Sequence, residues 1–524
     1  MTNAKFLDKL HDVFHKTETH VPKDVTPWNE PISKRSKYAI RKQRGVNLGS
    51  WFALESWLTG SLFQSLNESG SCDMDIVKGM NLEEAKQLLE RHWDSFIDDG
   101  DWKWMKAHGI NSVRIPILYA HFLAGNKEHT KLLKGTDYAS FATIYEGAWQ
   151  RIVASIEKAA SLDIGVLIDL HGVPGGQNGD SHCGKSDGNV SFWNGLHASS
   201  NRKLTIQILT ALAEAVSQYD NVIGLELMNE PQNHSCLEGF YVDAIKAIRA
   251  SSSPAVAQLP LYIGDGWDTN HYAKYVGKHS DIGNPLVLDH HMYRCFTSHD
   301  HRTSAEQHAC DLDVGKQGKT AWWLKGISEH AQGAIIIGEW SGALNPGSLR
   351  GCANHLDALK SWSHAQWHAF ESYTAGYYYW TLKKEGGPDP GWCFYTAVEK
   401  GTMPPSLNPL DGGHMDFNAL RQQGVELAQR CLQEHSKYWD SKGGNYDHEQ
   451  YKHGFEMGWK DALEFLQEGA EVGLPNQLAK LRLASYEQDH DPKNAWEFEH
   501  GFRQALEAFR RTLYLSLIHI SEPT

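Results

Sequence analysis

Short and nearly continuous hydrophobic runs recur between residues 44 and 383, without the polar–apolar alternation of half-exposed strands. Runs of this kind are typical of parallel strands that are buried on both faces. The eight runs are RGVNLG (44–49), NSVRIPI (111–117), IGVLIDLHG (164–172), VIGLELMNEP (222–231), LPLYIGDGW (259–267), PLVLDHHMY (285–293), AIIIGEWSG (334–342) and GYYYWTLK (376–383). The pattern therefore predicts eight buried strands.

Helical patterns separate these runs, for example over residues 82–109 and 145–165. The second pattern places apolar residues three and four positions apart, and both end near a glycine. Eight strand–helix units in succession predict an α/β fold, specifically a (β/α)8 TIM barrel.

The chain changes character after about residue 440, where helical patterns continue without intervening strands. Two of them share the sequence His-Gly-Phe, at 453–455 and 500–502, which is a weak repeat. We therefore expect an N-terminal lead-in over 1–40, the barrel over 41–440 and a C-terminal helical extension over 441–514. The last ten residues, LSLIHISEPT (515–524), resemble the translation of a sequencing-library adapter. We assign this tail no function and expect it to be disordered or poorly packed.

Composition narrows the classes of partner. The 524 residues carry a net charge of −14, which argues against nucleic acid or an anionic membrane as the main partner. No stretch reaches the roughly 18 apolar residues of a membrane span. The 19 tryptophans include candidates for stacking on sugar rings, although a large aromatic core is the simpler explanation for many of them.

The N-terminal sequence and the cysteines bear on the compartment. MTNAKFLDKLHDVFHK is charged and amphipathic and lacks the apolar core of a signal peptide. The eight cysteines have no metal-binding spacing and fit reduced core residues. We therefore expect a cytoplasmic protein, or a secreted one if the N-terminus is incomplete, and a monomer.

Polar and aromatic side chains gather at the C-terminal ends of the predicted strands. In a (β/α)8 barrel these ends meet at one face, which is where active sites lie. The side chains concerned are Arg114, His171, Asn229, Glu230, His291, Tyr293, Glu339 and Trp380. Buried polar residues of purely structural role would be found at both ends of the strands, so the sequence predicts an active site at this face.

Glu230 and Glu339 are the candidate catalytic pair, because each ends or interrupts an apolar strand and is costly to bury without a role. They follow the fourth and seventh strands and so are expected to face each other across the barrel. Hydrolysis of a glycosidic bond commonly uses two carboxyl groups in this way, one protonated and one ionised. A single glutamate at a strand end could instead cap a helix.

Six motifs in order resemble family 5 of the glycoside hydrolases: RGVNLGSW, VRIPI, DLHG, MNEP, HHMY and GEWSG. The resemblance covers about residues 44–400. RGVNLGSWFALESWLTGSLF and DLHGVPGGQNG further resemble the fungal exo-β-1,3-glucanase group. This resemblance implies a retaining, exo-acting enzyme that releases glucose from β-1,3-glucan without a metal or an organic cofactor.

The resemblance also implies a role for each residue. Glu230 would be the acid/base and Glu339 the nucleophile. Arg114 would hold Glu339 ionised, and Tyr293 would contact this nucleophile. Asn229 would bind the sugar 2-hydroxyl, and His171 and His291 would line the −1 subsite. Trp380 would lie beneath the −1 sugar, and Glu55 would bind the terminal glucose. His290 competes with His291 for its role, and the H-x-Y spacing favours His291.

The entrance departs from the group's pattern. Phe296 matches one of two phenylalanines that clamp the +1 sugar, but the position of the other holds Asp180, and Leu382 replaces a second tryptophan. A β-glucosidase acting on short oligosaccharides or glycolipid glucosides is therefore an alternative, and a non-catalytic carbohydrate-binding protein is a third. We interpret the histidine-rich segment 296–308 as a solvated loop rather than a metal site.

Overall fold

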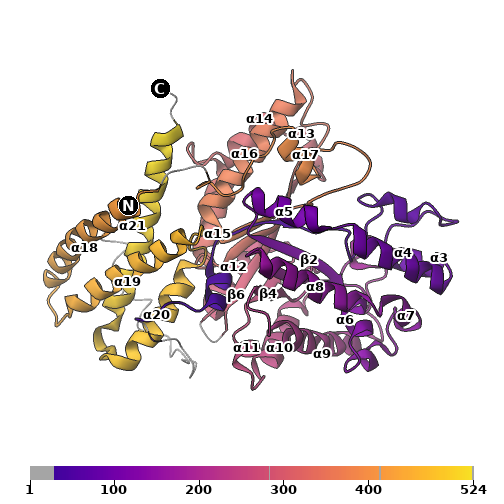
Figure 1. Cartoon of the computed structure of the whole chain (residues 1–524), viewed down its shortest axis with the longest axis horizontal. Coiled ribbons are helices and arrows are strands. Elements are labelled where there is room, and N and C mark those ends of the chain that lie inside the picture. Colours follow the sequence, from indigo (N-terminus) through magenta and orange to yellow (C-terminus); the bar gives the residue numbers. More distant parts are fainter. Residues whose placement is uncertain (1–26, 28, 282–283, 412–414, 522–524) are drawn as a thin grey trace. The chain divides into compact units, whose positions relative to one another are not determined.

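The computed structural model describes residue 27 and residues 29–281, 284–411 and 415–521, with side chains described as far as residue 513. The chain divides into two compact units. Residues 42–280 and 286–411 form the barrel unit. Residues 1–41, 281–285 and 412–524 form the second unit, which we call the helical unit (Figure 1).

Eight parallel strands close into a barrel in sequence order, with β1 paired to β8. This confirms the predicted (β/α)8 fold. The strands are β1 (Gln43–Asn47), β2 (Ser112–Leu118), β3 (Gly165–Gly172), β4 (Val222–Glu226), β5 (Leu261–Gly264), β6 (Leu286–Arg294), β7 (Ile335–Leu344) and β8 (Gly376–Tyr379). All residues of β3 and β7 are buried, as expected for strands covered on both faces.

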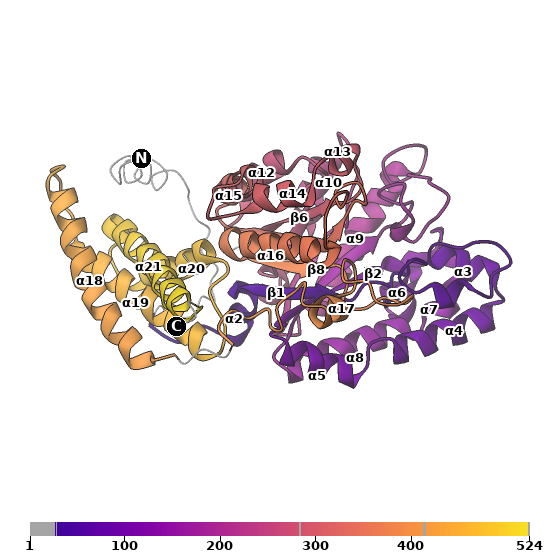
Figure 2. The same cartoon turned by 90° about the horizontal axis from the view of Figure 1, so that it is seen from above.

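Helices surround the strands and form the outer layer of the barrel unit (Figure 2). They are α3 (Asp73–Gly79), α4 (Leu82–Ser95), α5 (Asp99–Ala107), α6 (Tyr119–Gly125), α7 (Ala142–Tyr145), α8 (Ala148–Ser161), α9 (Ala198–Val216), α10 (Leu237–Arg249), α11 (Pro254–Ala257), α12 (Thr269–His279), α13 (Ser298–Arg302), α14 (Ala305–Leu312), α15 (Lys319–His330), α16 (His355–Tyr373) and α17 (Phe394–Glu399). Short 3-10 turns are η1 (Gly60–Phe63), η2 (Thr130–Leu133), η3 (Ala139–Phe141), η4 (Ser181–Cys183) and, in the helical unit, η5 (Pro492–Asn494).

The helical pattern expected over 82–109 is divided into α4 and α5. The division occurs because Asp98 caps α5: its side chain accepts a hydrogen bond from the backbone N–H of Asp101, and the Asp101 carboxylate accepts one from the N–H of Asp98. Such a reciprocal capping box begins a new helix.

The helical unit contains α2 (Lys34–Ile40), α18 (Phe417–Asp440), α19 (His448–Gln467), α20 (Pro475–Asp489) and α21 (Ala495–Ser521). Helices α18, α19 and α21 lie side by side (Figure 2). The two His-Gly-Phe segments meet where α19 packs on α21. A Cβ atom on Gly454 would clash with the carbonyl of Phe498, and one on Gly501 with the carbonyl of Tyr451. The repeat therefore marks glycines that let the two helix backbones approach closely.

The boundary between the units differs from the expected one at residue 440. Helix α18 packs on α19 and α21, so residues 417–440 belong to the helical unit and not to the barrel. The backbone of α21 continues in a helix to Ser521, where we expected disorder or poor packing over 515–524. Residues 522–524 of that tail lie outside the described residues, as does most of the lead-in 1–40.

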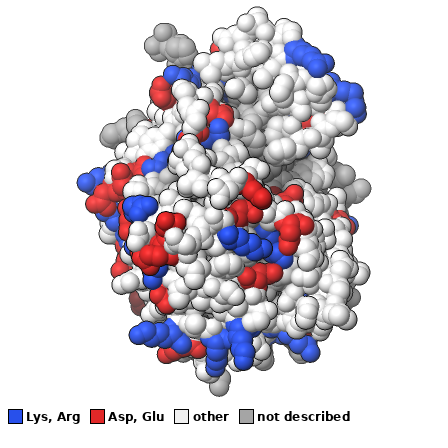
Figure 3. Space-filling view, turned by 90° about the vertical axis from the view of Figure 1, so that its right-hand side faces the viewer, with Lys and Arg blue, Asp and Glu red and all other residues white. Residues whose placement is uncertain are grey.

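Surface charge is mixed on the face that Figure 3 shows, where acidic and basic side chains lie interspersed among uncharged ones. Within the described parts of the chain, every helix is too short or too polar to span a lipid bilayer.

Candidate active site

Glu339 lies in the middle of β7 with both carboxylate oxygens hydrogen-bonded. The guanidinium of Arg114 donates to Oε1 at 3.0 Å, and the hydroxyl of Tyr293 donates to Oε2 at 2.8 Å. The register of the barrel creates this arrangement, because His291 of β6 pairs with Glu339 and places Tyr293 two residues farther along the same strand. Both donors hold the carboxylate in one orientation.

Glu230 follows β4 with a backbone φ of +40°, a conformation that non-glycine residues seldom adopt and that costs about 1–3 kcal/mol. The amide of Asn178 donates to the Glu230 carbonyl at 2.9 Å and so stabilises this turn. The carboxylate is joined to His291 by a hydrogen bond of 2.6 Å between Oε1 and Nδ1. The strained backbone thus presents the Glu230 side chain to the barrel opening.

The two carboxyl groups lie close together. One oxygen of Glu230 and one of Glu339 are within 4.8 Å of each other, with Nδ1 of His291 beside both. The His291 nitrogen lies 3.4 Å from Oε2 of Glu339. The two carboxyl groups are thus close enough to act on the same atom of a substrate.

The protonation of the pair follows from burial and from His291. Burial raises the pKa of Glu339 to about 7, although His291 and Arg114 act in the opposite direction. Burial also disfavours ionised Glu230, but the hydrogen bond and charge of His291 prevail and lower the pKa of Glu230 to about 2. The pKa of His291 is raised well above its ordinary value because Glu339, Asp289 and Glu230 outweigh its burial. The proton of this pair therefore lies on His291, and its Nδ1–H donates to an ionised Glu230.

Arg114 favours the ionised form of Glu339, but it does not fully offset the burial of that carboxyl. Its side chain is completely buried and also lies 2.8 Å from Glu226 and 3.1 Å from Asp169, both fully buried carboxylates. It donates a further hydrogen bond to Asn47. One positive charge is thus divided among several acidic groups, and the share left for Glu339 does not offset its burial.

His171, Asn229 and Trp380 line the same space. The Arg114 guanidinium donates to the Asn229 side-chain oxygen at 2.7 Å. His171 Nδ1 lies 2.6 Å from Asp169, its ring is parallel to Trp380 at 5.9 Å, and burial lowers its pKa to about 4. His171 is therefore a neutral imidazole whose Nε2 faces Asn229 at 3.5 Å.

The neighbouring histidines His290 and His291 have different contacts. His290 bonds to Asp265 at 2.7 Å and contacts the ring of Trp323, away from the two glutamates. His291 contacts both glutamates.

Aromatic side chains form one wall of the opening. Trp392, in the loop between β8 and α17, contacts the rings of Tyr293, Phe296 and Trp57 at 5.6, 6.1 and 5.1 Å. Phe296 is 72% exposed. The indole N–H of Trp57 donates to the Glu55 carboxylate at 2.8 Å. Glu55 is thereby connected to the wall, and burial raises its pKa.

Two residues at the opening were not identified from the sequence. Trp392 lies in a loop beyond the eighth strand, outside the strand-end pattern. His182 lies in η4, and its Nε2 is 3.6 Å from Oε2 of Glu230. Burial opposes the charge on His182, but Glu230 and Glu55 prevail and raise its pKa. The one sequence signal for His182 is its place two residues after Asp180, which itself is exposed to solvent.

Two overlapping groups here have the composition of metal sites, Glu230–His291–Glu339 and Glu226–Asp289–His291. Arg114 lies 3.0 Å from Glu339, 2.8 Å from Glu226 and 3.9 Å from Asp289. The charge that a divalent cation would supply is thus already present, and the guanidinium would repel a second cation.

Two family models match the chain. Residues 77–386 match the cellulase model of glycosyl hydrolase family 5, and residues 420–513 match a model described as the C-terminal domain of glucan 1,3-beta-glucosidase 3. The chain belongs to glycosyl hydrolase family 5. As a family 5 protein it is a glycoside hydrolase. Apart from residues 281–285, the first matched region falls in the barrel unit, and the second falls in the helical unit.

Family 5 relatives resemble the chain over different lengths. Glucan 1,3-beta-glucosidase 3 of Schizosaccharomyces pombe is 33% identical, over an alignment that covers 90% of this chain and 96% of the relative. Glucan 1,3-beta-glucosidase of Blumeria graminis is 28% identical and covers 71% of this chain and 88% of the relative. The solved rutinosidase of Aspergillus niger has a TM-score of 0.52 at 19% identity, covering 71% of this chain and 99% of that one, which supports the fold alone.

Proposed function

We propose that this family 5 enzyme is a retaining, exo-acting β-1,3-glucosidase that removes glucose from β-1,3-glucan. The observation that carries the proposal is the close approach of Glu230 and Glu339, whose nearest oxygens lie within 4.8 Å. Retaining enzymes hold their carboxyls about 5–5.5 Å apart, whereas inverting enzymes need about 6.5–9.5 Å to admit a water. The substrate class is supported by the names of the Schizosaccharomyces pombe and Blumeria graminis relatives.

In the first step, an oxygen of Glu339 bonds to C1 of the terminal glucose while the C1–O bond to the leaving sugar breaks. Glu230 takes up the proton of His291 and passes it to the departing oxygen. In the second step Glu230 removes a proton from water and returns it to His291, the water oxygen bonds to C1, and the ester to Glu339 breaks. The product is β-glucose, and both carboxyls return to their first state.

The surrounding residues stabilise these steps. Asn229, which accepts a hydrogen bond from Arg114, would bind the sugar 2-hydroxyl, and Trp380 offers a flat surface parallel to His171. Glu55 would accept hydrogen bonds from the hydroxyls of a terminal glucose, a role that favours exo-cleavage. The aromatic wall of Trp392 and Phe296 would hold the +1 sugar by stacking on its apolar face.

A second candidate is a β-glucosidase that acts on short oligosaccharides or glycolipid glucosides. The exposed carboxylate of Asp180 favours it, because the group's usual aromatic clamp is missing on that side of the opening. Both candidates use the same two glutamates, and only the leaving group differs.

A product profile separates the candidates. The purified enzyme is incubated with laminari-oligosaccharides, gentiobiose, cellobiose and a steryl glucoside, and the products are followed by proton NMR from the first minutes. We expect monomer release from the β-1,3 chains, with the β-anomer appearing first. Glu339→Gln serves as the inactive control. Oligosaccharide products or α-glucose first would contradict the proposal, and faster cleavage of gentiobiose or the steryl glucoside would select the second candidate.

A further inference from the structure

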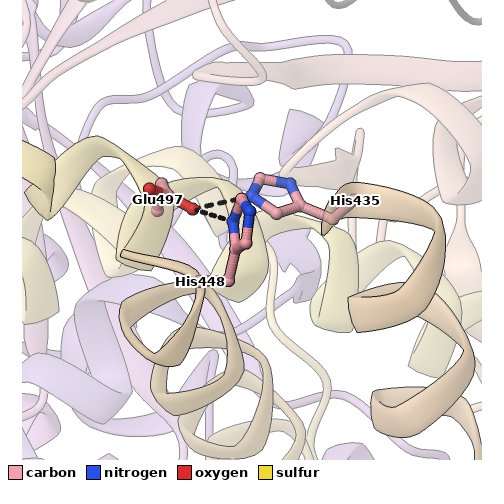
Figure 4. Close-up of side chains that lie close together, drawn as sticks. All are labelled: His435, His448 and Glu497. Atoms are coloured by element: carbon pink, nitrogen blue, oxygen red, sulfur yellow. Dashed lines mark hydrogen bonds and ion pairs between the residues drawn. The ribbon is translucent and has the colours of Figure 1, made fainter. Parts of the chain in front are cut away.

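Three side chains from three different helices converge inside the helical unit (Figure 4). His435 belongs to α18, His448 is the first residue of α19, and Glu497 lies in the first turn of α21. Oε2 of Glu497 lies 2.9 Å from Nε2 of His435 and 2.8 Å from Nδ1 of His448. One nitrogen from each histidine and one oxygen from the glutamate are all within 4.8 Å of one another.

The cluster is buried where a carboxylate is costly. The side chains of Glu497 and His435 are 0% and 1% exposed, and that of His448 is 21% exposed. A buried carboxylate needs strong compensating partners, and here a single oxygen atom faces both imidazoles. Nδ1 of His435, on the far side of its ring, is buried and has no hydrogen-bond partner among the described residues. A simple hydrogen-bonded pair would not require two histidines aimed at one oxygen.

Outer contacts orient two of the three donors. Oδ1 of Asp440 lies 3.2 Å from Nε2 of His448, which fixes a proton on that nitrogen and leaves Nδ1 free to bind. The backbone N–H of Asp447 donates to Oε1 of Glu497 at 2.7 Å, which leaves Oε2 facing the histidines. Carboxylate-to-histidine contacts of this kind are the usual second layer around a bound metal ion.

We propose that His435, His448 and Glu497 bind a divalent zinc-type ion that joins α18, α19 and α21. Two imidazole nitrogens and a carboxylate oxygen are donors that Zn²⁺ accepts at about 2.0–2.2 Å. A tetrahedral ion at these distances holds its donors about 3.3 Å apart, so the two nitrogen–oxygen distances need to widen by about half an ångström. Water takes the fourth position, on the side where His448 is exposed.

The ion has a structural consequence. α18 is joined to α19 by a short connection, whereas α21 comes from a later part of the chain. A bound ion fixes one end of α18 to the beginnings of α19 and α21, next to the glycine contacts of Gly454 and Gly501. We therefore expect metal binding to stabilise the helical unit against unfolding.

The test uses the full chain, purified without a histidine tag, stripped with a chelator and dialysed against Zn²⁺ or Co²⁺. Elemental analysis should give one ion per chain. Bound Co²⁺ should show the visible absorption of tetrahedral coordination, and the Tm should rise with free Zn²⁺ concentration.

Variants assign the ion to this cluster. His448→Ala, at a partly exposed position, and the isosteric Glu497→Gln should each weaken binding at least 100-fold, and Asp440→Asn should weaken it by about 10–100-fold. The matched control is His271→Ala. It removes a half-exposed histidine of the barrel unit that lies 2.6 Å from Glu238, and this variant should bind the ion as the wild type does. A second control is the double variant Glu230→Gln, Glu339→Gln, which removes the carboxylates of the active-site group and should retain the ion.

Two results would overturn the proposal. One is wild-type protein that takes up no more Zn²⁺ than His448→Ala and shows no metal-dependent Tm. The other is uptake that survives in His448→Ala but is lost in the Glu230→Gln, Glu339→Gln variant.

Discussion

Replacing Glu230 by glutamine removes the proposed proton donor with little change of shape. The side chain is 15% exposed, and the amide oxygen of a glutamine at this position can still accept a hydrogen bond from Nδ1 of His291, 2.6 Å from the present oxygen. The contacts of Glu339 with Arg114 and Tyr293 do not involve Glu230. The substitution therefore tests proton transfer rather than folding.

The size of the effect depends on the leaving group. General acid catalysis contributes about 10²–10⁴-fold, or about 2.7–5.4 kcal/mol at 1.36 kcal/mol per factor of ten. A disaccharide or alkyl glucoside needs the whole of this assistance, because its oxygen leaves as a strong base. A dinitrophenyl glucoside needs almost none. For Glu230→Gln, kcat/KM should fall about 10²–10⁴-fold on laminaribiose and stay within a few-fold on the activated glucoside.

The assay measures kcat/KM for a series of aryl and alkyl glucosides, because kcat/KM reports the first chemical step. Glu339→Gln is the control and should lose activity on every substrate, since each needs the nucleophile. Added azide should accelerate turnover of the activated glucoside by Glu230→Gln and yield β-glucosyl azide, whereas Glu339→Ala should yield α-glucosyl azide. Equal losses of Glu230→Gln on activated and natural leaving groups would refute the assigned role.

Further predictions concern pH, the opening and the helical unit. Because the nucleophile must be ionised and burial raises the pKa of Glu339 to about 7, kcat/KM should fall as pH decreases through about 7. In His291→Gln, which loses a positive charge, this acidic limb of the pH profile should move to higher pH. An unmoved acidic limb would contradict the assignment of the limb to Glu339. Trp392→Ala should raise KM for laminaritriose several-fold while leaving kcat/KM for β-glucosyl fluoride, whose leaving group does not fill the +1 subsite, nearly unchanged, and equal effects on both substrates would argue against a +1 contact. Gly454→Ala should lower the free energy of unfolding by at least about 1–3 kcal/mol in denaturant titrations, because its Cβ meets the α21 backbone. The control Gly239→Ala, in open space on α10, should raise stability by up to about 1 kcal/mol, and similar behaviour of the two variants would refute the close-packing explanation.

Much of the barrel could be predicted because its strands are buried on both faces and produce continuous apolar runs. The polar residues at the strand ends could be predicted for the same reason, since a charged side chain such as Arg114 in an apolar run requires partners. The structure brings His291 into contact with both Glu230 and Glu339, and Tyr293 into contact with Glu339, in line with the order of the strands.

Loop residues could not be predicted in this way. Trp392 and His182 reach the opening through loops whose paths depend on tertiary packing, and no periodicity precedes them. The charge balance of the site could not be predicted from the sequence either. Whether Arg114 can keep Glu339 ionised depends on its other neighbours, Asp169 and Glu226, whose distances from it only the closed barrel determines.

The helical unit shows a different limit. Helix α18 has an ordinary amphipathic sequence, and nothing in it states whether it packs on the barrel or on α19. The cluster of His435, His448 and Glu497 could not be predicted from the sequence either, because its members belong to three different helices and lack a metal-binding spacing. Only the glycines of the His-Gly-Phe repeat gave a sequence signal for the packing of α19 on α21.

The most direct test of the central claim is to trap the covalent intermediate with an activated 2-deoxy-2-fluoro-glucoside and to locate the label by peptide mass spectrometry. The fluorine slows both formation and hydrolysis of the ester, whereas the activated leaving group restores the rate of formation alone, so the intermediate accumulates. The account predicts one fluoroglucosyl group per chain, attached to Glu339, and no label in Glu339→Gln. A label on Glu230 or on another residue, or full turnover without any label, would contradict it.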